Sequence, residues 1–272
     1  MSSIPRPEHP RPDFERKAWQ NLNGEWQFGV DSSKSGLEKG WHSGVDLPLT
    51  INVPFCPESS LSGLGMTDFL EAVWYRRRFS VDPALSGRRL LLHFGAVDYD
   101  ARAWVNGKEV VRHRGGYTPF EADITEVVDM TSENELVLYA DDDERSHVQP
   151  LGKQSSRLKS YGCCYTRTTG IWQTVWLEAV PASRVTNVTV WPDAPNGRAA
   201  VVVDVDAPHA GLGVEVAALA DGDVVAAAKL VQAGPTNTVI LDVPDPVLWE
   251  VGRPFLYDLR VRLVEGETVV DE

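Results

Sequence analysis

The residues whose side chains are best suited to binding or catalysis lie in a polar segment, which ends where an apolar stretch begins. Lys153 and Gln154 offer a cation and an amide, groups that hydrogen-bond sugar hydroxyls, although solvent exposure explains both equally well. Further on, a hydroxyl-rich run at 165–169 carries Arg167. This loop predicts one edge of a binding site. A structural role for Arg167, in which it ties loop carbonyls together, stays open beside that interpretation.

The three cysteines do not form a disulfide framework, because their number and spacing do not provide one. Reduced thiols in a cytoplasmic protein are therefore the expected state. Cys163 and Cys164 are adjacent and could be redox-active. No Cys-x-x-Cys spacing and no cation at a fixed position supports that role.

The chain lacks the sequence motifs of several other kinds of binding or catalytic site. No phosphate-binding loop follows a strand, and no Gly-x-Ser-x-Gly nucleophile elbow occurs. The six histidines are scattered without metal-ligand spacing. The acidic run at 141–144 lacks the pattern of a calcium-binding loop, so we predict a solvated turn there. We expect no metal and no other cofactor.

Net charge and length further restrict the partners that the chain is expected to bind and the class of protein to which it belongs. The 272 residues carry a formal net charge of -13, which argues against nucleic acid and against an anionic membrane surface as partners. The start of the chain has no apolar signal region, and no stretch reaches the roughly 18 apolar residues of a membrane span. Four prolines make the first dozen residues an extended arm, either solvated or lying along the protein.

The segment after the polar loop is predicted to be a single strand that positions the loop. Ile171, Val175 and Leu177 point one way, and Trp172 and Trp176 point the other. Alternation with a period of two is typical of a strand, and two apolar faces indicate that both of its sides are covered.

Similar patterns predict strands through the first two thirds of the chain. Asn106 and Gly107 lie between two alternating runs and predict a tight hairpin turn, since both positions need positive φ. Residues 73–81 read as a half-buried strand and residues 90–97 as a central one. The remaining strands are expected at 25–28, 49–53, 101–105, 108–111 and 136–139.

The composition shifts after position 180 toward alanine and valine. Six or so short strands in about 90 residues, with a turn at Asp221-Gly222, indicate an immunoglobulin-like sandwich. Tyr257 is a candidate for a tyrosine corner. No helical window longer than about three turns occurs, so the chain is predicted to be all-β with two sandwiches.

Several short motifs, taken in order, give the chain a resemblance to a known family. None is specific alone, but their succession resembles the N-terminal part of family 2 glycoside hydrolases, the β-galactosidase, β-glucuronidase and β-mannosidase group. The motifs occupy positions 23–28, 74–79, 94–97, 104–107, 115–120, 152–154, 168–173, 248–249 and 255–259.

This resemblance implies a jelly-roll sugar-binding domain at 1–180 and an immunoglobulin-like domain at 181–272, whose last strand is expected to be truncated. In the family a (β/α)8 barrel follows and carries the chemistry, with two carboxylates about 5–5.5 Å apart in retaining enzymes. We therefore assign no catalytic residue. The chain is expected to be the non-catalytic N-terminal portion of a retaining β-glycosidase, which meets its carbohydrate substrate through the barrel.

The resemblance also suggests residues at the substrate rim. Galactosidase- and glucuronidase-like members have an Asp near the substrate at the position where this chain has Cys164. Galactosidase-like members have an Asn after a Val-Pro step at the position where this chain has Cys56. A thiol cannot replace a carboxylate as acceptor of two sugar hydroxyls, which weakens a claim for either sugar. The substrate-rim candidates are Cys56, Lys153, Gln154, Cys164, Tyr165 and Arg167.

Two other functions remain open. A stand-alone carbohydrate-binding module predicts an exposed aromatic platform, and a structural β-sandwich protein predicts no sugar binding at all. Members of the family often assemble through these domains, so a homo-oligomer is also open.

Overall fold

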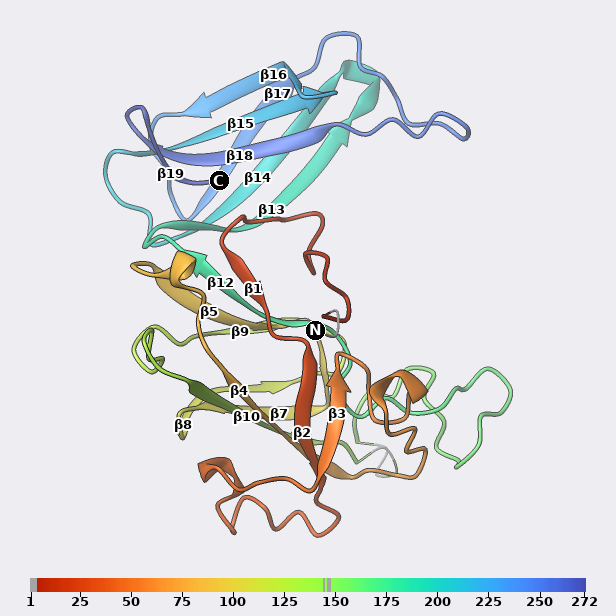
Figure 1. Cartoon of the computed structure of the whole chain (residues 1–272). Coiled ribbons are helices and arrows are strands. Elements are labelled where there is room, and N and C mark those ends of the chain that lie inside the picture. Colours follow the sequence, from red (N-terminus) through yellow and green to blue (C-terminus); the bar gives the residue numbers. More distant parts are fainter. Residues whose placement is uncertain (1–3, 144, 146–147) are drawn as a thin grey trace. The chain divides into compact units, whose positions relative to one another are not determined.

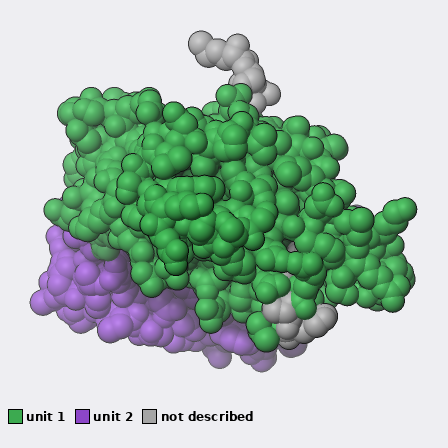
Figure 2. Space-filling view, turned by 90° about the horizontal axis from the view of Figure 1, so that it is seen from below, with its two compact units in different colours: residues 1–179 green, residues 180–272 purple. Residues whose placement is uncertain are grey.

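The computed structural model describes residues 4–143, 145 and 148–272. The chain divides into two compact units between Ala179 and Val180, coloured separately in Figure 2, where the sequence placed the boundary at 180/181. The described residues form strands and short 3-10 turns, without an α-helix. No helix in this part of the chain is long and apolar enough to cross a membrane. The all-β prediction is confirmed.

Unit 1 is a sandwich of two main antiparallel sheets (Figure 1). One sheet holds, in spatial order, β1 (Trp19–Asn21), β12 (Val175–Val180), β5 (Arg89–Phe94) and β9 (Phe120–Asp123). The other holds β3 (Leu49–Val53), β2 (Gly24–Val30), β4 (Ala72–Phe79), β10 (Asn134–Asp141), β7 (Asp100–Val105) and β8 (Lys108–Arg114). A small third sheet pairs β6 (Val97–Asp98) with β11 (Gly170–Ile171).

Strand β4 lies inside its sheet, between β2 and β10, and is buried on both faces. Tyr75 belongs to the core between the sheets, while Trp74 packs on the opposite face against Trp104. Arg76 is also buried, with its guanidinium bonded to the carboxylates of Glu135 and Asp46. The prediction of a half-buried strand is therefore wrong at Arg76, which is covered and paired, whereas Arg78 and Ser80 are exposed as predicted.

The hairpin between β7 and β8 turns at Asn106 and Gly107, with φ of 50° and 78°. Positive φ at both positions confirms the predicted turn. The Asn106 amide also donates to the carbonyl of Val127 and the Asn134 side chain, both at 2.8 Å. Its oxygen accepts the N–H of Glu135 at 2.9 Å. This turn thus ties the hairpin to the start of β10.

Replacing Asn106 with alanine should lower the free energy of unfolding by about 2 kcal/mol, since three hydrogen bonds and a residue suited to positive φ are lost. Urea denaturation followed by tryptophan fluorescence measures the change. Lys108→Ala at an exposed neighbouring position should stay within about 0.5 kcal/mol of wild type. Equal stability of the Asn106 and Lys108 variants would contradict this account.

Residues 170–180 form two short strands, and the single strand predicted there is wrong. β11 ends at Ile171 and β12 begins at Val175, with a bend at Gln173 between them. The indole N–H of Trp172, in this break, donates to the Gly116 carbonyl at 2.8 Å. The two faces are as predicted: Ile171 and Val175 enter the core. On the other face Trp176 stacks on His93, with ring centroids 4.7 Å apart.

The N-terminal arm lies along unit 1. Asn21 and Asn23 donate to the carbonyls of Arg6 and Pro5, at 2.9 and 3.1 Å. The His9 ring meets Trp19 edge-on at 4.8 Å. The sequence left open whether this proline-rich stretch is solvated or lies along the protein. Its described residues pack on unit 1.

Unit 2 is a second two-sheet sandwich. One sheet holds β13 (Arg184–Asp193), β14 (Arg198–Asp206) and β17 (Thr236–Asp242). The other holds β16 (Asp223–Leu230), β15 (Leu212–Ala220), β18 (Asp258–Glu265) and β19 (Thr268–Asp271). The Tyr257 hydroxyl accepts the N–H of Val247 at 2.7 Å, the kind of bond that a tyrosine corner makes.

Candidate functional site

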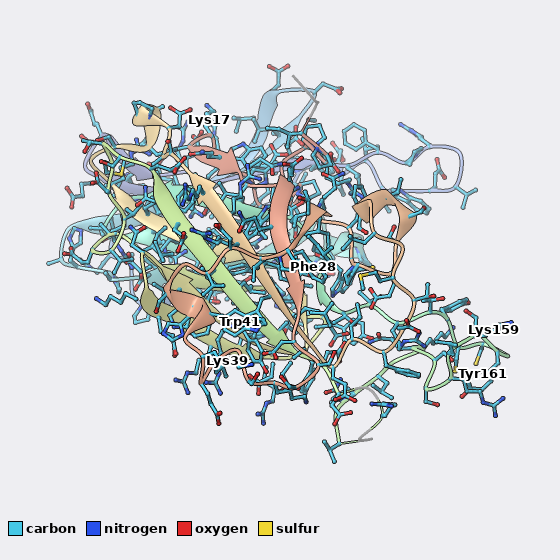
Figure 3. All side chains as sticks on the ribbon, turned by 60° about the horizontal axis from the view of Figure 1, so that its bottom comes forward. Lys17, Phe28, Lys39, Trp41, Lys159 and Tyr161 are labelled. Carbon is cyan, nitrogen blue, oxygen red and sulfur yellow. The ribbon has the colours of Figure 1, made fainter. Side chains whose placement is uncertain are left out.

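The polar loop between β10 and β11 projects from the body of unit 1 (Figure 1). Figure 3 labels Lys159 and Tyr161 in its outer part, far from the core residue Phe28. The outer turn closes by two backbone bonds between Tyr161 and Cys164, of 3.1 and 2.8 Å. Gly162 has a φ of 52° inside that turn, a conformation that glycine adopts at little cost.

Arg167 holds the loop together from inside. Its side chain is 2% exposed, and its guanidinium donates to the carbonyls of Ser155, Arg157 and Thr67. The guanidinium also lies over the Phe69 ring, 4.2 Å from its centroid. Buried carbonyls require donors, and one guanidinium supplies five N–H groups. These contacts describe the structural role that the sequence left open for Arg167.

Gln154 links the loop to the sandwich. Its amide nitrogen donates to Asp98 Oδ2 at 2.7 Å, and its amide oxygen accepts the N–H of Thr168 at 2.6 Å. On the neighbouring strand of the loop, the Tyr165 N–H donates to the Lys153 carbonyl at 2.7 Å. Lys153, Gln154 and Tyr165 are thus brought together; Lys153 and Tyr165 are exposed, Tyr165 at 61%, and Gln154 is half-buried.

The cysteine candidates lie in two places. Cys164 is half-buried in the outer turn and Cys163 beside it is exposed. Cys56 is half-buried, and burial together with the charge of Glu58 raises the pKa of its thiol to about 12. The Cys56 thiol is therefore protonated at neutral pH and is a poor nucleophile.

Iodoacetamide at neutral pH should alkylate Cys163 first and Cys56 last, at least about a hundredfold more slowly than an exposed thiol, because the thiolate is the reacting form. Peptide mass mapping over time measures both rates. In denaturing urea the difference should vanish. Comparable rates for Cys56 and Cys163 in the native protein would show that the Cys56 site is more open than the structure has it.

Three buried carboxyl groups lie where the loop meets the sandwich, and sequence reasoning missed them. They belong to Glu58, Asp98 and Asp142. Glu58 accepts the N–H of Thr169 at 3.2 Å and Asp142 accepts the Gln149 amide at 2.5 Å. The acidic run at 141–144 was predicted to be a solvated turn, which is wrong for Asp142, whose side chain is buried; Glu144 lies outside the described residues.

Burial sets the protonation of these acids. It raises the pKa of Asp98 to about 6, against a hydrogen bond from Gln154 that lowers it. It raises the pKa of Asp142 to about 8, and the charge of Asp98 adds to the increase. The pKa of Glu58 is raised by burial as well. Gly116 makes room for Asp98, because a Cβ there would lie 2.1 Å from Asp98 Oδ1.

A large cleft opens on unit 1 beside the base of the loop. It measures about 740 Å³ and runs between the N-terminal arm and the turn after β11. Its walls are formed by residues 6, 8–12 and 15 of the arm and by residues 54–55, 95, 117, 119, 172–174 and 176. Its carboxylates, Glu8 and Glu15, both come from the arm. The pKa of Glu8 is lowered, first by its backbone hydrogen bond and then by Arg6.

The cleft therefore lacks the carboxyl pair of a retaining glycosidase. Such enzymes place a proton-donating carboxyl with a raised pKa opposite a nucleophilic carboxylate, on the two sides of the sugar. Glu8 and Glu15 share one wall, and Glu8 is held ionised. Asp142, whose pKa is raised, is buried where the loop meets the sandwich. Burial also raises the pKa of Glu178 on β12, which does not line the cleft and accepts a hydrogen bond from Arg16 at 3.1 Å. Among the described residues, the lining of the cleft offers hydrogen-bond donors and acceptors to a polar ligand.

Comparison with known proteins places both units in one family. Residues 48–142 match the sugar binding domain of glycosyl hydrolases family 2, and residues 183–272 match a second domain of glycosyl hydrolases family 2. A β-glucuronidase of Paenibacillus borealis is 28% identical over 264 residues, covering 91% of this chain and 42% of the relative. A β-galactosidase of Thermoanaerobacter pseudethanolicus is 27% identical over 218 residues, covering 75% of this chain and 28% of the relative.

Solved structures agree with the fold. A β-glucuronidase of Ruminococcus gnavus superposes with a TM-score of 0.76 at 24% identity, covering 95% of this chain and 45% of that one. The chain thus spans less than half the length of these relatives. The two matched regions follow each other in the same chain and together cover more than half of it, so the chain belongs to glycosyl hydrolases family 2, as its N-terminal sugar-binding and immunoglobulin-like domains.

Proposed function

We propose that this chain is the non-catalytic N-terminal portion of a retaining β-glycosidase that releases terminal β-linked sugars. The chemistry belongs to a barrel domain outside these 272 residues. The chain contributes packing surface and, through the outer part of its polar loop, residues at the rim of the substrate site. Within that loop, Lys153, Tyr165 and Cys164 are the side chains proposed to reach the rim, since Gln154 and Arg167 are engaged inside.

One observation carries this proposal. One family match is to a sugar binding domain and the other to a second domain of the family, while the relatives that share them are named as glycosidases and are more than twice as long. The free cysteines support a reducing compartment, and we propose the cytoplasm.

The proposal is tested by assaying the 272-residue chain against nitrophenyl β-glucuronide, β-galactoside and β-mannoside. We expect no release of nitrophenol above the buffer rate. Turnover at enzyme-like rates would reveal a carboxyl pair within this chain and overturn the proposal. The coding sequence beyond Glu272 provides a second test: a continuing frame with alternating strand and helix patterns supports the glycosidase, and an immediate natural stop contradicts it.

A carbohydrate-binding role without any catalytic partner is the second candidate. The cleft on unit 1, with aromatic and polar side chains in its walls, favours it over a purely structural role. An exposed aromatic side chain at the cleft, Tyr117, is the feature that a binding module requires.

A further inference from the structure

The two adjacent cysteines lie in the outer turn of the polar loop, where reagents in solution reach them. The side chain of Cys163 is exposed and that of Cys164 is half-buried. Tyr161, which pairs with Cys164, and Lys159 stand at the outer end of the loop in Figure 3. The third thiol differs, because Cys56 is half-buried and its raised pKa, about 12, keeps it protonated at neutral pH. Cys163 and Cys164 are therefore the thiols that are open to reaction.

The loop around this pair is basic, although the protein is acidic. Residues 148–169 contain four lysines or arginines and no Asp or Glu, whereas the whole chain has a formal net charge of -13. Arg157 and Lys159 are exposed. Arg157 also lies 4.1 Å from the centroid of the Tyr161 ring, and Tyr161 pairs with Cys164 in the outer turn. A cluster of exposed positive charge attracts anionic reagents to the two thiols.

A disulfide between neighbouring residues is a strained and easily reversed bond. The peptide between Cys163 and Cys164 is trans, so their Cα atoms are about 3.8 Å apart, below the roughly 4.4–6.8 Å of ordinary disulfides. Such a bond closes almost no chain and adds little to the stability of the fold. Strained and exposed disulfides are readily reduced, which suits a reversible modification better than a structural cross-link.

A bond between these two sulfurs would act directly on the outer turn. The Cys164 N–H donates to the Tyr161 carbonyl at 2.8 Å, and the Cys164 carbonyl accepts the Tyr161 N–H at 3.1 Å. Both hydrogen bonds depend on the backbone conformation of the cysteines. Closing a small ring through their side chains changes φ and ψ at both residues, because the ring must relieve the short Cα separation. Oxidation of the pair therefore competes with the bonds that close the turn.

We propose that Cys163 and Cys164 are a redox-active thiol pair, which small anionic disulfides such as oxidised glutathione convert to a vicinal disulfide. The Cys163 sulfur attacks one sulfur of glutathione disulfide, whose S–S bond breaks, and one glutathione leaves with the proton of Cys163. The Cys164 sulfur then attacks the Cys163 sulfur and expels the second glutathione, which takes the proton of Cys164. Two electrons pass from the protein thiols to glutathione, and two glutathione thiols are formed.

This thiol pair goes beyond the proposed function, since it needs neither a sugar nor a catalytic domain. Its effect falls on the same loop, where the Tyr165 N–H donates to the Lys153 carbonyl beside the outer turn. Opening of the turn would shift the side chains that are proposed to reach the substrate rim. Reversible oxidation also agrees with the proposed cytoplasmic location, where disulfides are transient and often redox-sensing.

Redox titration of the 272-residue chain tests the pair. The reduced chain is equilibrated at neutral pH with mixtures of reduced and oxidised glutathione, quenched with N-ethylmaleimide and mapped by peptide mass spectrometry. In oxidising mixtures the peptide with Cys163 and Cys164 should lose two hydrogens and carry no glutathione, while Cys56 should stay a thiol that is labelled only after unfolding. Trypsin should cut after Arg157 and Lys159 at least about threefold faster in the oxidised chain, and dithiothreitol should restore the slower rate.

Serine variants separate the two steps of the reaction. Cys164→Ser lacks the second thiol, so glutathione should accumulate on Cys163 at least about tenfold above its level in wild type. Cys163→Ser keeps only the half-buried thiol and should react with glutathione disulfide about tenfold more slowly. With both cysteines replaced by serine, trypsin should cut at the same rate in reducing and oxidising mixtures.

The charge of the reagent tests the role of the basic loop. Glutathione disulfide is anionic and hydroxyethyl disulfide is neutral. Only the first should react more slowly, by about twofold or more, at high salt or in Lys159→Gln, a change at an exposed position. Equal effects on both reagents would contradict the attraction by the loop.

Four results would overturn the thiol pair. They are a glutathione adduct that persists on Cys163 in wild type, disulfides between chains in place of the internal one, thiols that stay reduced in the most oxidising mixture, and tryptic cleavage that does not change on oxidation. Nitrophenyl glycoside turnover would overturn the proposed function and leave the thiol chemistry standing.

Discussion

Replacing Arg167 with alanine will lower the free energy of unfolding by about 3 kcal/mol, because carbonyls buried under the loop lose their donors. Arg167 donates to the carbonyls of Ser155, Arg157 and Thr67, which join the two arms of the loop to the segment before β4. Water cannot replace the guanidinium where the side chain is almost fully enclosed. Urea denaturation gives the energy, and limited proteolysis shows whether cleavage moves to residues 153–166.

Arg157→Ala is the matched control, since it removes an arginine from the same loop. The Arg157 guanidinium lies 4.1 Å from the centroid of the Tyr161 ring at an exposed position, and its loss should cost less than about 1 kcal/mol. Arg167→Lys keeps the charge but not the planar fork, so it should fall between the two. If Arg167→Ala proves as stable as Arg157→Ala, the contacts of Arg167 do not hold the loop.

Asp142→Asn will change how stability depends on pH. Burial, with the charge of Asp98, raises the folded-state pKa of Asp142 from an ordinary 3.8 to about 8. Between these values the native state holds a proton that the unfolded chain releases. The stabilisation is complete below pH 3.8 and is lost as the pH rises through about 8. Asparagine does not titrate, so the variant lacks this pH-dependent contribution to the free energy of unfolding.

Relative to wild type, Asp142→Asn should therefore gain about 1.4 kcal/mol per pH unit between pH 5 and pH 7. Chemical denaturation at several pH values gives the slope. Asp129→Asn is the control: hydrogen bonds from Thr131 lower the pKa of the exposed Asp129 carboxyl below its ordinary 3.8, so this variant loses stability relative to wild type only as the pH rises through that acidic range. Between pH 5 and pH 7 its curve should run parallel to that of wild type. Parallel pH curves for wild type and Asp142→Asn would mean that Asp142 is hydrated in solution.

These two residues show where sequence reasoning reached its limit. Both were visible in the sequence, Arg167 as a candidate for the rim and Asp142 as part of a solvated acidic run. The chain around each is polar, and local polarity predicts exposure. The structure places both inside, because the loop of residues 142–169 folds back over its own polar groups and must satisfy its carbonyls internally.

The sequence by itself determined the all-β class, the succession of two sandwiches and the turn at Asn106-Gly107, because these follow from local rules. A period of two separates the faces of a strand, and a turn with positive φ selects asparagine and glycine. The alternation in the sequence also predicted correctly that Ile171 and Val175 lie on the opposite face from Trp176.

Only the tertiary structure decided which polar groups are buried, where the chain breaks between β11 and β12, and what the cleft contains. The cleft brings together residues of the arm, such as His9 and Pro12, with Pro54, Tyr117 and Trp172, which are far apart in the chain. No local pattern records such a meeting, because burial and pKa depend on neighbours in space. Those neighbours are fixed only when the sheets pack and the proline-rich arm lies along them.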